Sequence, residues 1–415
     1  MNRLDVRKMT DKERFVLAGY IVSIGADEYL DLFYSAKKKN NGDTGSTNMV
    51  SSKEKAKELA KKYALEQCIR TGTYSAKCAS KGGPFIGTLA DYLGMKAGDN
   101  IFFFSDRRIY GIGKLVNIGN KDCRFRIHPK QGMGITEDLL EEKYPDNHQF
   151  VCTFVPDPYF FLQGVDTDEV LTSCPDKITS LRFFSGMTFM KLDDIECEAI
   201  KNVIARKNED FLSDDDNYSH FIFDKSIHDQ ITKSVINMEA YDLSVFDYIK
   251  YTSHGFVSSE YYIEGATMEL LRNYTSEILG KWDFIGRQYP ASPPKPSQYK
   301  EAMDLFGYRY VPKFQGAVSK YLVIEVKVGT INKENVEQTM KYVDWISREY
   351  AHGDYSMVQA YTIGFDKEQG IESEIQDIIE RNYITDGRPV KNKKWQDLRI
   401  LSYCTILKEL REKNS

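Results

Sequence analysis

The sequence lacks the marks of a membrane, secreted or zinc-binding protein. No uninterrupted apolar run among its 415 residues approaches the roughly 18 that a membrane span needs, and the first residues are charged instead of forming a signal peptide. The seven cysteines show no C-x-x-C spacing and the six histidines are scattered, so we expect buried thiols, not a disulfide framework or a zinc site. These absences predict a cytoplasmic protein with no membrane partner.

Neither sign of charge is in large excess, because the formal net charge is only −5. That balance excludes a polycationic nucleic-acid coat, but it allows an acidic exterior beside a local basic groove. With 41% hydrophobic residues, the chain is long enough for several domains with cores of their own. We predict an α+β, α/β multidomain protein: an N-terminal α+β module (1–210), a connector (211–245) marked by the acidic stretch 207–217, and a C-terminal domain (246–415). A further division near 140–150 stays open.

Two charged residues interrupt an apolar, β-branched run at residues 321–328, which reads YLVIEVKV. Side chains of a strand alternate between its two faces, so Glu325 and Lys327 share one face while Ile324 and Val326 point to the other. Burying either charge without a partner costs several kcal/mol. An exposed edge-strand ion pair is the plainer alternative and would contribute under about 1 kcal/mol. In this apolar run we favour a functional pair that acts on a metal ion and a water molecule.

A second acid precedes this strand. Residues 303–308 form an apolar, strand-like segment that contains Asp304, and the chain then turns through residues 312–320 before it enters the Glu-x-Lys strand. This order predicts a hairpin with Asp304 on one arm and the Glu-x-Lys pair on the other. Asp283, beside a tryptophan, is the alternative acid. We prefer Asp304 because it lies on the strand immediately before the pair.

A helix is predicted after the Glu-x-Lys strand. Residues 334–346 (ENVEQTMKYVDWI) carry apolar side chains at helical spacing, which is typical of a helix that packs against a sheet. The same spacing places Gln338 and Tyr342 four residues apart on one stripe. A solvated helix face explains Gln338 as well as a role in a site does.

A further acid lies upstream. Glu264 opens a predicted helix (266–278), which leads to a predicted strand (282–289), and the domain ends with a strand at 398–403. Glu269 is the alternative acid on this helix. A solvated helix face is again a sufficient explanation for either residue.

The order of these elements resembles the nuclease core of the PD-(D/E)XK superfamily, the restriction-endonuclease-like phosphodiesterases. The resemblance covers residues 250–410 and is nearest to the C-terminal domains of NucS-like endonucleases and to phage-defence nucleases such as Shedu. It implies a mixed sheet flanked by helices. The proline-rich loop 289–300 is longer than in compact members of the superfamily, so the choice between Asp304 and Asp283 stays open.

The resemblance also implies how the polar residues on the strands act. Asp304, Glu325 and the main-chain carbonyl of Val326 would hold Mg²⁺, or Mn²⁺ as a substitute, because these ions prefer hard oxygen ligands. Lys327 would orient the attacking water and help to deprotonate it, with a pKa lowered by the neighbouring cation and by partial burial.

Two helix residues complete the site that the resemblance implies. Gln338 would position the nucleophile or the nucleic-acid strand, and Glu264 would bind a second ion or a water near the first. We therefore expect a Mg²⁺-dependent DNA endonuclease of restriction or anti-phage defence, which binds DNA and forms a homo-oligomer. A repair or structure-specific nuclease is one alternative, and a catalytically idle nucleic-acid-binding scaffold is another.

The N-terminal half contains a predicted hairpin over residues 101–116, followed by a strand at 123–127. Around residues 90–130 this pattern resembles small β-barrels of the PUA/EVE-like kind, some of which read modified bases. The resemblance implies a sensing or DNA-docking module with a barrel-like part. Barrel core at 102–104 and close strand packing at Gly111 and Gly113 explain the same residues without such a role.

Helices are predicted near the start of the chain. Residues 1–36 are expected to be largely helical, and residues 52–68 form a second predicted helix that Ser52 caps. The Gly-, Asn- and Ser-rich stretch between them is a predicted loop.

Overall fold

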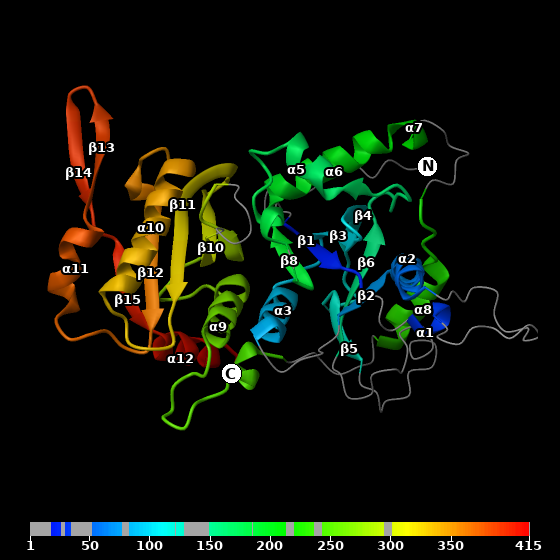
Figure 1. Cartoon of the computed structure of the whole chain (residues 1–415), viewed down its shortest axis with the longest axis horizontal. Coiled ribbons are helices and arrows are strands. Elements are labelled where there is room, and N and C mark those ends of the chain that lie inside the picture. Colours follow the sequence, from blue (N-terminus) through cyan, green and yellow to red (C-terminus); the bar gives the residue numbers. More distant parts are fainter. Residues whose placement is uncertain are drawn as a thin grey trace, which may run out of the picture. The chain divides into compact units, whose positions relative to one another are not determined.

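The computed structural model describes residues 18–25, 30–34, 52–76, 83–120, 122–127, 149–184, 186–212, 220–235, 243–293 and 301–414. These residues form a mixed α+β structure in which one sheet is curled into a half-barrel. The chain divides into two compact units (Figure 1). The N-terminal unit comprises Tyr20–Lys191 and Ile195–Lys250, and the C-terminal unit comprises Met1–Gly19, Leu192–Asp194 and Tyr251–Ser415.

The larger sheet belongs to the N-terminal unit. Its strands follow the order β2-β6-β4-β3-β1-β8, with β5 paired to β6 and β7 paired to β4. The elements of this half are β1 (Gly19–Ser23), α1 (Leu30–Phe33), α2 (Lys53–Thr71), β2 (Thr73–Ala76), α3 (Gly83–Leu93), β3 (Asn100–Ser105), β4 (Arg108–Leu115), β5 (Arg124–Ile127), β6 (Gln149–Pro156), β7 (Val165–Asp166), α5 (Thr167–Ser173), β8 (Phe189–Leu192), α6 (Asp194–Lys207), α7 (Glu209–Leu212) and α8 (Lys225–Val235).

Two predictions for this half are confirmed: the hairpin at residues 101–116 and the helix that Ser52 caps. Strands β3 and β4 pair antiparallel, and Ser52 caps α2 by accepting a hydrogen bond from the main chain of Lys55. A Cβ on Gly113 would lie 2.5 Å from the ring of Phe160, so this glycine permits the close packing that the sequence indicates. The predicted helix over residues 1–36 is wrong at 19–23, where β1 lies inside the sheet and its first four residues are buried. The predicted loop at 37–51 and the division near 140–150 lie outside the described residues.

The predicted connector contains part of the N-terminal core. Helix α8 lies within residues 211–245, and its Ile231 and Val235 are buried in a cluster with Phe125 and Val151 of the sheet. The apolar residues of this short helix recur at helical spacing, so one face of the helix is buried. The acidic stretch before the helix makes this spacing harder to recognise in the sequence. The segment is therefore part of the N-terminal unit and not a separate linker.

The C-terminal unit is built around a five-stranded mixed sheet with the order β15-β12-β11-β10-β9. Strands β9, β10 and β11 are antiparallel neighbours, whereas β11, β12 and β15 are parallel. The elements are α9 (Glu260–Asn273), β9 (Phe284–Pro290), β10 (Ala302–Val311), β11 (Phe314–Val326), α10 (Lys333–Glu349), β12 (Val358–Gly364), α11 (Ile371–Ile379), β13 (Arg381–Gly387), β14 (Val390–Trp395), β15 (Leu398–Ser402) and α12 (Tyr403–Asn414).

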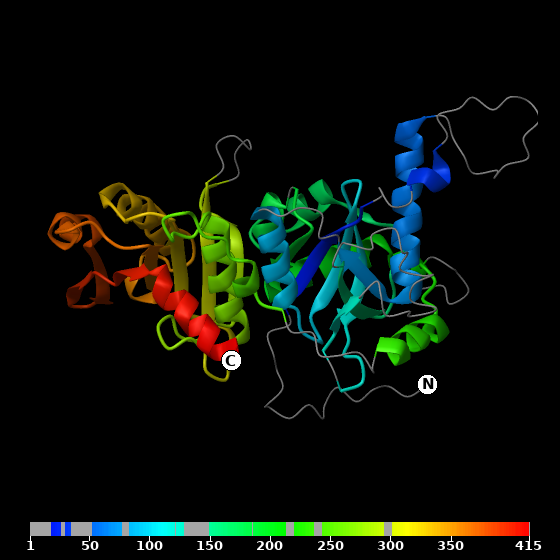
Figure 2. The same cartoon turned by 90° about the horizontal axis from the view of Figure 1, so that it is seen from below.

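Helices cover both faces of this sheet. Helix α10 lies on one face, and α9 and α12 lie on the other, as Figure 2 shows. The apolar stripe predicted for α10 is confirmed, because Val336, Met340, Val343 and Ile346 are all buried in the core cluster that includes Val323 of β11. The sequence places the start of α9 too late. The helix begins at Glu260, so Glu264 lies inside it and not before it.

The structure bears on two expectations drawn from composition, the absence of a membrane span and the burial of the cysteines. No helix in the described ranges combines the length and the apolar character that crossing a bilayer requires. Cys123, Cys152 and Cys197 are buried as expected, but Cys404, in the first turn of α12, is exposed. Cys68 and Cys174 are partly exposed, and Cys78 lies outside the described residues.

Gly307 tests the close packing of β9 and β10. A Cβ at this position would lie 2.5 Å from Cδ1 of Ile285 and 2.8 Å from the carbonyl oxygen of Phe284. Because that oxygen belongs to the main chain of β9, Gly307→Ala should destabilise the C-terminal unit by about 1–3 kcal/mol. Gly387→Ala, where an added Cβ meets nothing within 4 Å, should leave stability almost unchanged.

The measurement is a urea titration followed by tryptophan fluorescence. All three tryptophans of the chain lie between residues 282 and 395, so the signal reports only on the C-terminal unit. Equal unfolding midpoints for the two variants would contradict the packing argument.

His228 predicts how acid affects the N-terminal unit. It is buried, and its Nδ1 lies 3.0 Å from the carbonyl oxygen of Thr71 at the end of α2. Burial lowers the pKa of His228 below its ordinary value. The unfolded chain then binds the proton more readily. The contribution of neutral His228 to stability is therefore complete above about pH 6.5 and is lost as the pH falls below that value. His228→Asn, which can keep the hydrogen bond without titrating, should flatten this dependence when urea midpoints are followed by pulse proteolysis.

Candidate active site

Two carboxylates face the same side of the sheet near the end of β11. Register pairs Phe306 with Val323, and both pack in the core beneath α10. Asp304 precedes Phe306 by two residues, and Glu325 follows Val323 by two, so strand alternation brings both carboxylates to the α10 face. The predicted hairpin is confirmed in this respect, with Asp304 on β10 and the Glu-x-Lys pair at the end of β11.

Asp304 binds the main chain of its neighbour strand. Its Oδ2 accepts a hydrogen bond of 2.8 Å from the N–H of Val326. Burial raises the pKa of Asp304, although this hydrogen bond and the charge of Lys327 act in the opposite direction. The carboxylate is therefore held at the point where β11 leaves the sheet.

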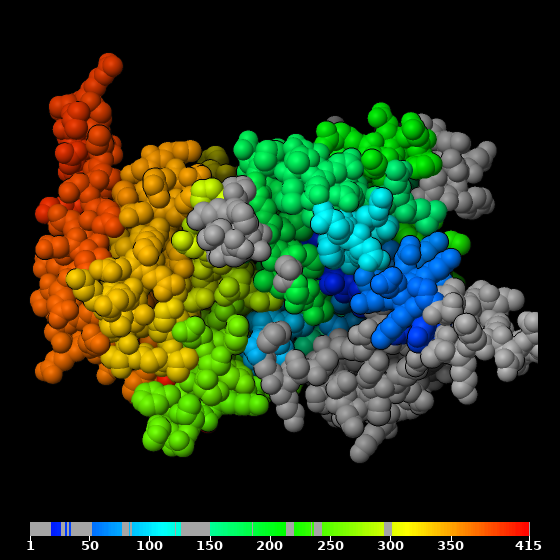
Figure 3. Space-filling model, in the orientation of Figure 1, coloured from blue at the N-terminus to red at the C-terminus, as the bar shows by residue number. Residues whose placement is uncertain are grey.

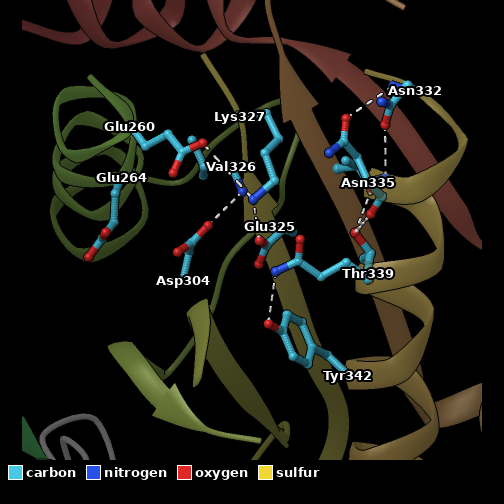
Figure 4. A network of polar contacts seen from close by, with 12 residues as sticks. Glu260, Glu264, Asp304, Glu325, Val326, Lys327, Asn332, Asn335, Thr339 and Tyr342 are labelled. Atoms are coloured by element: carbon cyan, nitrogen blue, oxygen red, sulfur yellow. Dashed lines mark hydrogen bonds and ion pairs between the residues drawn. The ribbon is translucent and has the colours of Figure 1, made fainter. Parts of the chain in front are cut away.

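Glu325 and Lys327 form the ion pair at the centre of the site (Figure 4). The Lys327 Nζ donates to Oε1 of Glu325 at 2.6 Å, and Glu325 is only 2% exposed. Oε2 of Glu325 is also buried and has no hydrogen-bond partner among the described residues. Burial and the nearby charge of Asp304 raise the pKa of Glu325 to about 7, against the pull of Lys327. The site thus contains a buried acid whose charge is only partly balanced.

The residues around Lys327 raise its pKa when no ion is bound. Burial alone lowers the pKa, but the hydrogen bond and charge of Glu325, together with the charges of Glu260 and Asp304, outweigh burial and raise it. The lowered pKa that the sequence predicts refers to a site that holds a cation, so it stays a prediction. Without an ion, Lys327 is protonated and donates its hydrogen bond to Glu325 as a charged group.

Glu264 joins the site through an intermediate residue that the sequence does not reveal. The side-chain amide of Gln288 donates to Oε2 of Glu264 at 3.2 Å and to Oδ1 of Asp304 at 3.3 Å. Gln288 adopts φ +48, a left-handed conformation that is uncommon for residues other than glycine. No pattern in the sequence signals this conformation, which directs the amide between the two acids.

The two alternative acids lie elsewhere. Glu269 is buried, and its Oε1 accepts a hydrogen bond of 3.2 Å from Asn414 of α12. Asp283 is exposed before β9, and its Oδ2 accepts a hydrogen bond of 2.7 Å from the main chain of Tyr310. Tyr310 is six residues along β10 from Asp304, which corresponds to roughly 20 Å of strand. The geometry therefore favours Glu264 and Asp304.

Glu260 is a site residue that the sequence analysis missed. Its Oε1 lies 4.0 Å from Nζ of Lys327, and the two side chains face each other in Figure 4. Burial raises the pKa of Glu260, and Asp304 raises it further, against Lys327. Glu260 precedes Glu264 by one helical turn, so a search for acids on the same stripe of α9 could have found it.

Gln338 and Tyr342 lie on the stripe of α10 that borders the acids. The side-chain amide of Gln338 donates to the hydroxyl of Tyr342 at 3.0 Å. Burial raises the pKa of Tyr342, and the charges of Glu325 and Asp304 raise it further. The predicted spacing is confirmed, and its consequence is a neutral hydroxyl beside the carboxylates.

The donor set fits a divalent cation in part. Within the described ranges, no three His, Cys, Asp or Glu side chains are grouped so as to hold a metal ion. Asp304 and Glu325 supply two carboxylates, and Mg²⁺ commonly binds through one or two carboxylates with water in its remaining positions. The buried, unpartnered Oε2 of Glu325 is the observation that favours a cation, since an additional positive charge would satisfy it.

Comparison of the chain with family models, with curated proteins and with solved structures finds no match.

Metal binding can be measured without reference to any reaction. Calorimetric titration with Mn²⁺ should detect a site in the wild type, and Glu325→Gln should weaken it at least tenfold because the amide loses the charge that holds the ion. Glu269→Gln is the matched control: it changes another buried glutamate, on α9, that contacts Asn414 instead of the site. Equal affinities for the wild type and Glu325→Gln would exclude Glu325 as a ligand.

Proposed function

We propose that the protein is a Mg²⁺-dependent DNA endonuclease with a restriction-endonuclease-like core, which acts in restriction or anti-phage defence as a homo-oligomer. The observation that carries the proposal is that Asp304, Glu325 and Lys327 meet at the end of β11, where Oε2 of Glu325 is buried and has no hydrogen-bond partner among the described residues. The order of the strands, with Asp304 and the Glu-x-Lys pair on adjacent arms of one hairpin, supports the same core.

Each residue has a defined task in such a reaction. Asp304, Glu325 and the carbonyl of Val326 would hold the ion, and Mg²⁺ when bound supplies charge stabilisation at the scissile phosphate and a more acidic water. Lys327, whose Nζ donates to Glu325, would orient the attacking water and offset phosphate charge. Glu264 acts through Gln288, which holds the Asp304 carboxylate in place.

The alternative of an idle binding scaffold is less favourable on physical grounds. A buried carboxylate beside a second one destabilises the fold unless a ligand uses it, because both burial and like charge disfavour ionisation. A core without a ligand would be more stable with an apolar residue at position 325 of β11. The presence of two acids and a lysine at this buried position therefore supports catalysis.

Cleavage assays test this proposal. Glu325→Gln and Asp304→Asn should each reduce Mg²⁺-dependent cleavage of plasmid or phage DNA by on the order of 100-fold or more, since several kcal/mol of charge stabilisation are lost. Asp283→Asn should cut at nearly the wild-type rate, because an amide oxygen can still accept the hydrogen bond from Tyr310. Wild-type cleavage by Glu325→Gln, or loss of cleavage in Asp283→Asn alone, would overturn the assignment.

A further inference from the structure

Strands β13 and β14 form a two-stranded antiparallel ribbon, residues 381–395, that lies outside the five-stranded sheet. The ribbon projects from the C-terminal unit in Figure 1, and the space-filling view in Figure 3 shows its tip standing clear of the neighbouring atoms. Residues 384–394 are all exposed. An isolated ribbon of this length is only marginally stable in water, so something must hold it.

The base of the ribbon is firmly attached. Arg381 makes a two-pronged ion pair with Asp344 of α10, with distances of 2.8 and 2.9 Å. Trp395, across the ribbon from Arg381, is 4% exposed and donates from Nε1 to the carbonyl of Val358 at 2.9 Å. These contacts fix the direction of the ribbon, so its tip can meet a partner with little ordering cost.

The ribbon carries strong positive charge in an acidic protein. It contains five basic residues and one acidic residue, which gives it a net charge of +4. Because the whole chain has a net charge of −5, the residues outside the ribbon have a net charge of −9. The basic residues are Arg381, Arg388, Lys391, Lys393 and Lys394.

Two of these cations are available to a partner. Lys391 pairs with Asp386 at 3.2 Å and Lys394 with Glu380 at 2.8 Å. The described part of the chain places no acidic side chain within ion-pair distance of Arg388 or Lys393, and both are exposed. Two β-branched side chains, Ile384 and Val390, are each 63% exposed on the same ribbon. By strand alternation Ile384 and Val390 lie on one face of the ribbon and Lys393, opposite Tyr383, lies on the other, with Arg388 in the turn.

We propose that the ribbon docks in the major groove of duplex DNA, an inference that rests on the proposed function in taking DNA as the substrate. A two-stranded ribbon fits this groove, which is about 12 Å wide. The face with Ile384 and Val390 lies against base edges such as thymine methyl groups, while Arg388 in the turn and Lys393 on the opposite face contact the phosphates that flank the groove. The net charge of +4 complements DNA, while the acidic remainder of the chain does not.

The ribbon holds DNA away from the reacting phosphate. Its anchor, Val358, pairs with Tyr321, whereas Lys327 lies six residues further along β11 and past its end. The base of the ribbon therefore lies roughly 20 Å along the strand direction from Lys327, which corresponds to about six base pairs of duplex. Ribbon substitutions should therefore raise KM and leave kcat within about twofold.

The test measures binding of a fluorescent 24-base-pair duplex by anisotropy, in EDTA and over a series of salt concentrations. The double variant Arg388→Ser, Lys393→Ser should bind more weakly, and the slope of log K against log salt should fall by about one for each cation removed. The control double variant Lys367→Ser, Lys408→Ser removes the same charge from lysines that already have acidic partners, and it should match the wild type.

A second variant separates apolar contact from charge. Ile384→Ser, Val390→Ser should weaken binding several-fold without changing the salt slope. Tryptophan fluorescence, which includes the signal of Trp395 at the base of the ribbon, verifies that each variant is folded.

The outcomes distinguish this inference from the proposed function. Ribbon-dependent binding by a protein that cuts no DNA in Mg²⁺ supports the ribbon and overturns the endonuclease. Mg²⁺-dependent cleavage together with equal binding by the ribbon and control variants overturns the ribbon proposal and indicates a different, acidic partner for it.

Discussion

The burial of Glu325 next to a second carboxylate is the constraint on which the C-terminal site depends. Burial and the charge of Asp304 both raise the pKa of Glu325, and Lys327 is the hydrogen-bond partner that offsets them. Such a pair contributes little to stability, because desolvation cancels much of the attraction. The position of this ion pair at the end of an apolar strand therefore favours a role in binding a ligand over a role in stability.

The surrounding fold makes this arrangement possible. The antiparallel register of β10 and β11 brings the two acids to one face, and the apolar stripe of α10 packs on that face. Gln288 and the N–H of Val326 then hold Asp304 from two sides. The same unit anchors its basic ribbon through Arg381 and Trp395, so the site and the ribbon belong to one compact unit.

Local patterns predicted the elements whose signals are complete within a few residues. Alternation over residues 321–328 and the helical spacing over 334–346 were sufficient for β11 and α10, because burial on one face leaves a period in the sequence. The start of α9 and the strand β1 were predicted wrongly. Consecutive buried residues in β1 resemble a helix segment as much as a strand, and only neighbouring strands decide between them.

The sequence by itself determined which residue types the site contains: an aspartate, Glu325 and Lys327 in apolar strands, and Gln338 beside Tyr342 on a helix. The tertiary structure decided that the aspartate is Asp304 and not Asp283, that Gln288 links Asp304 to Glu264 and not to Glu269, and that Glu260 faces Lys327. A pKa depends on every charge and on the burial around a group. Those neighbours come from elements far apart in the chain, so only the folded arrangement sets them.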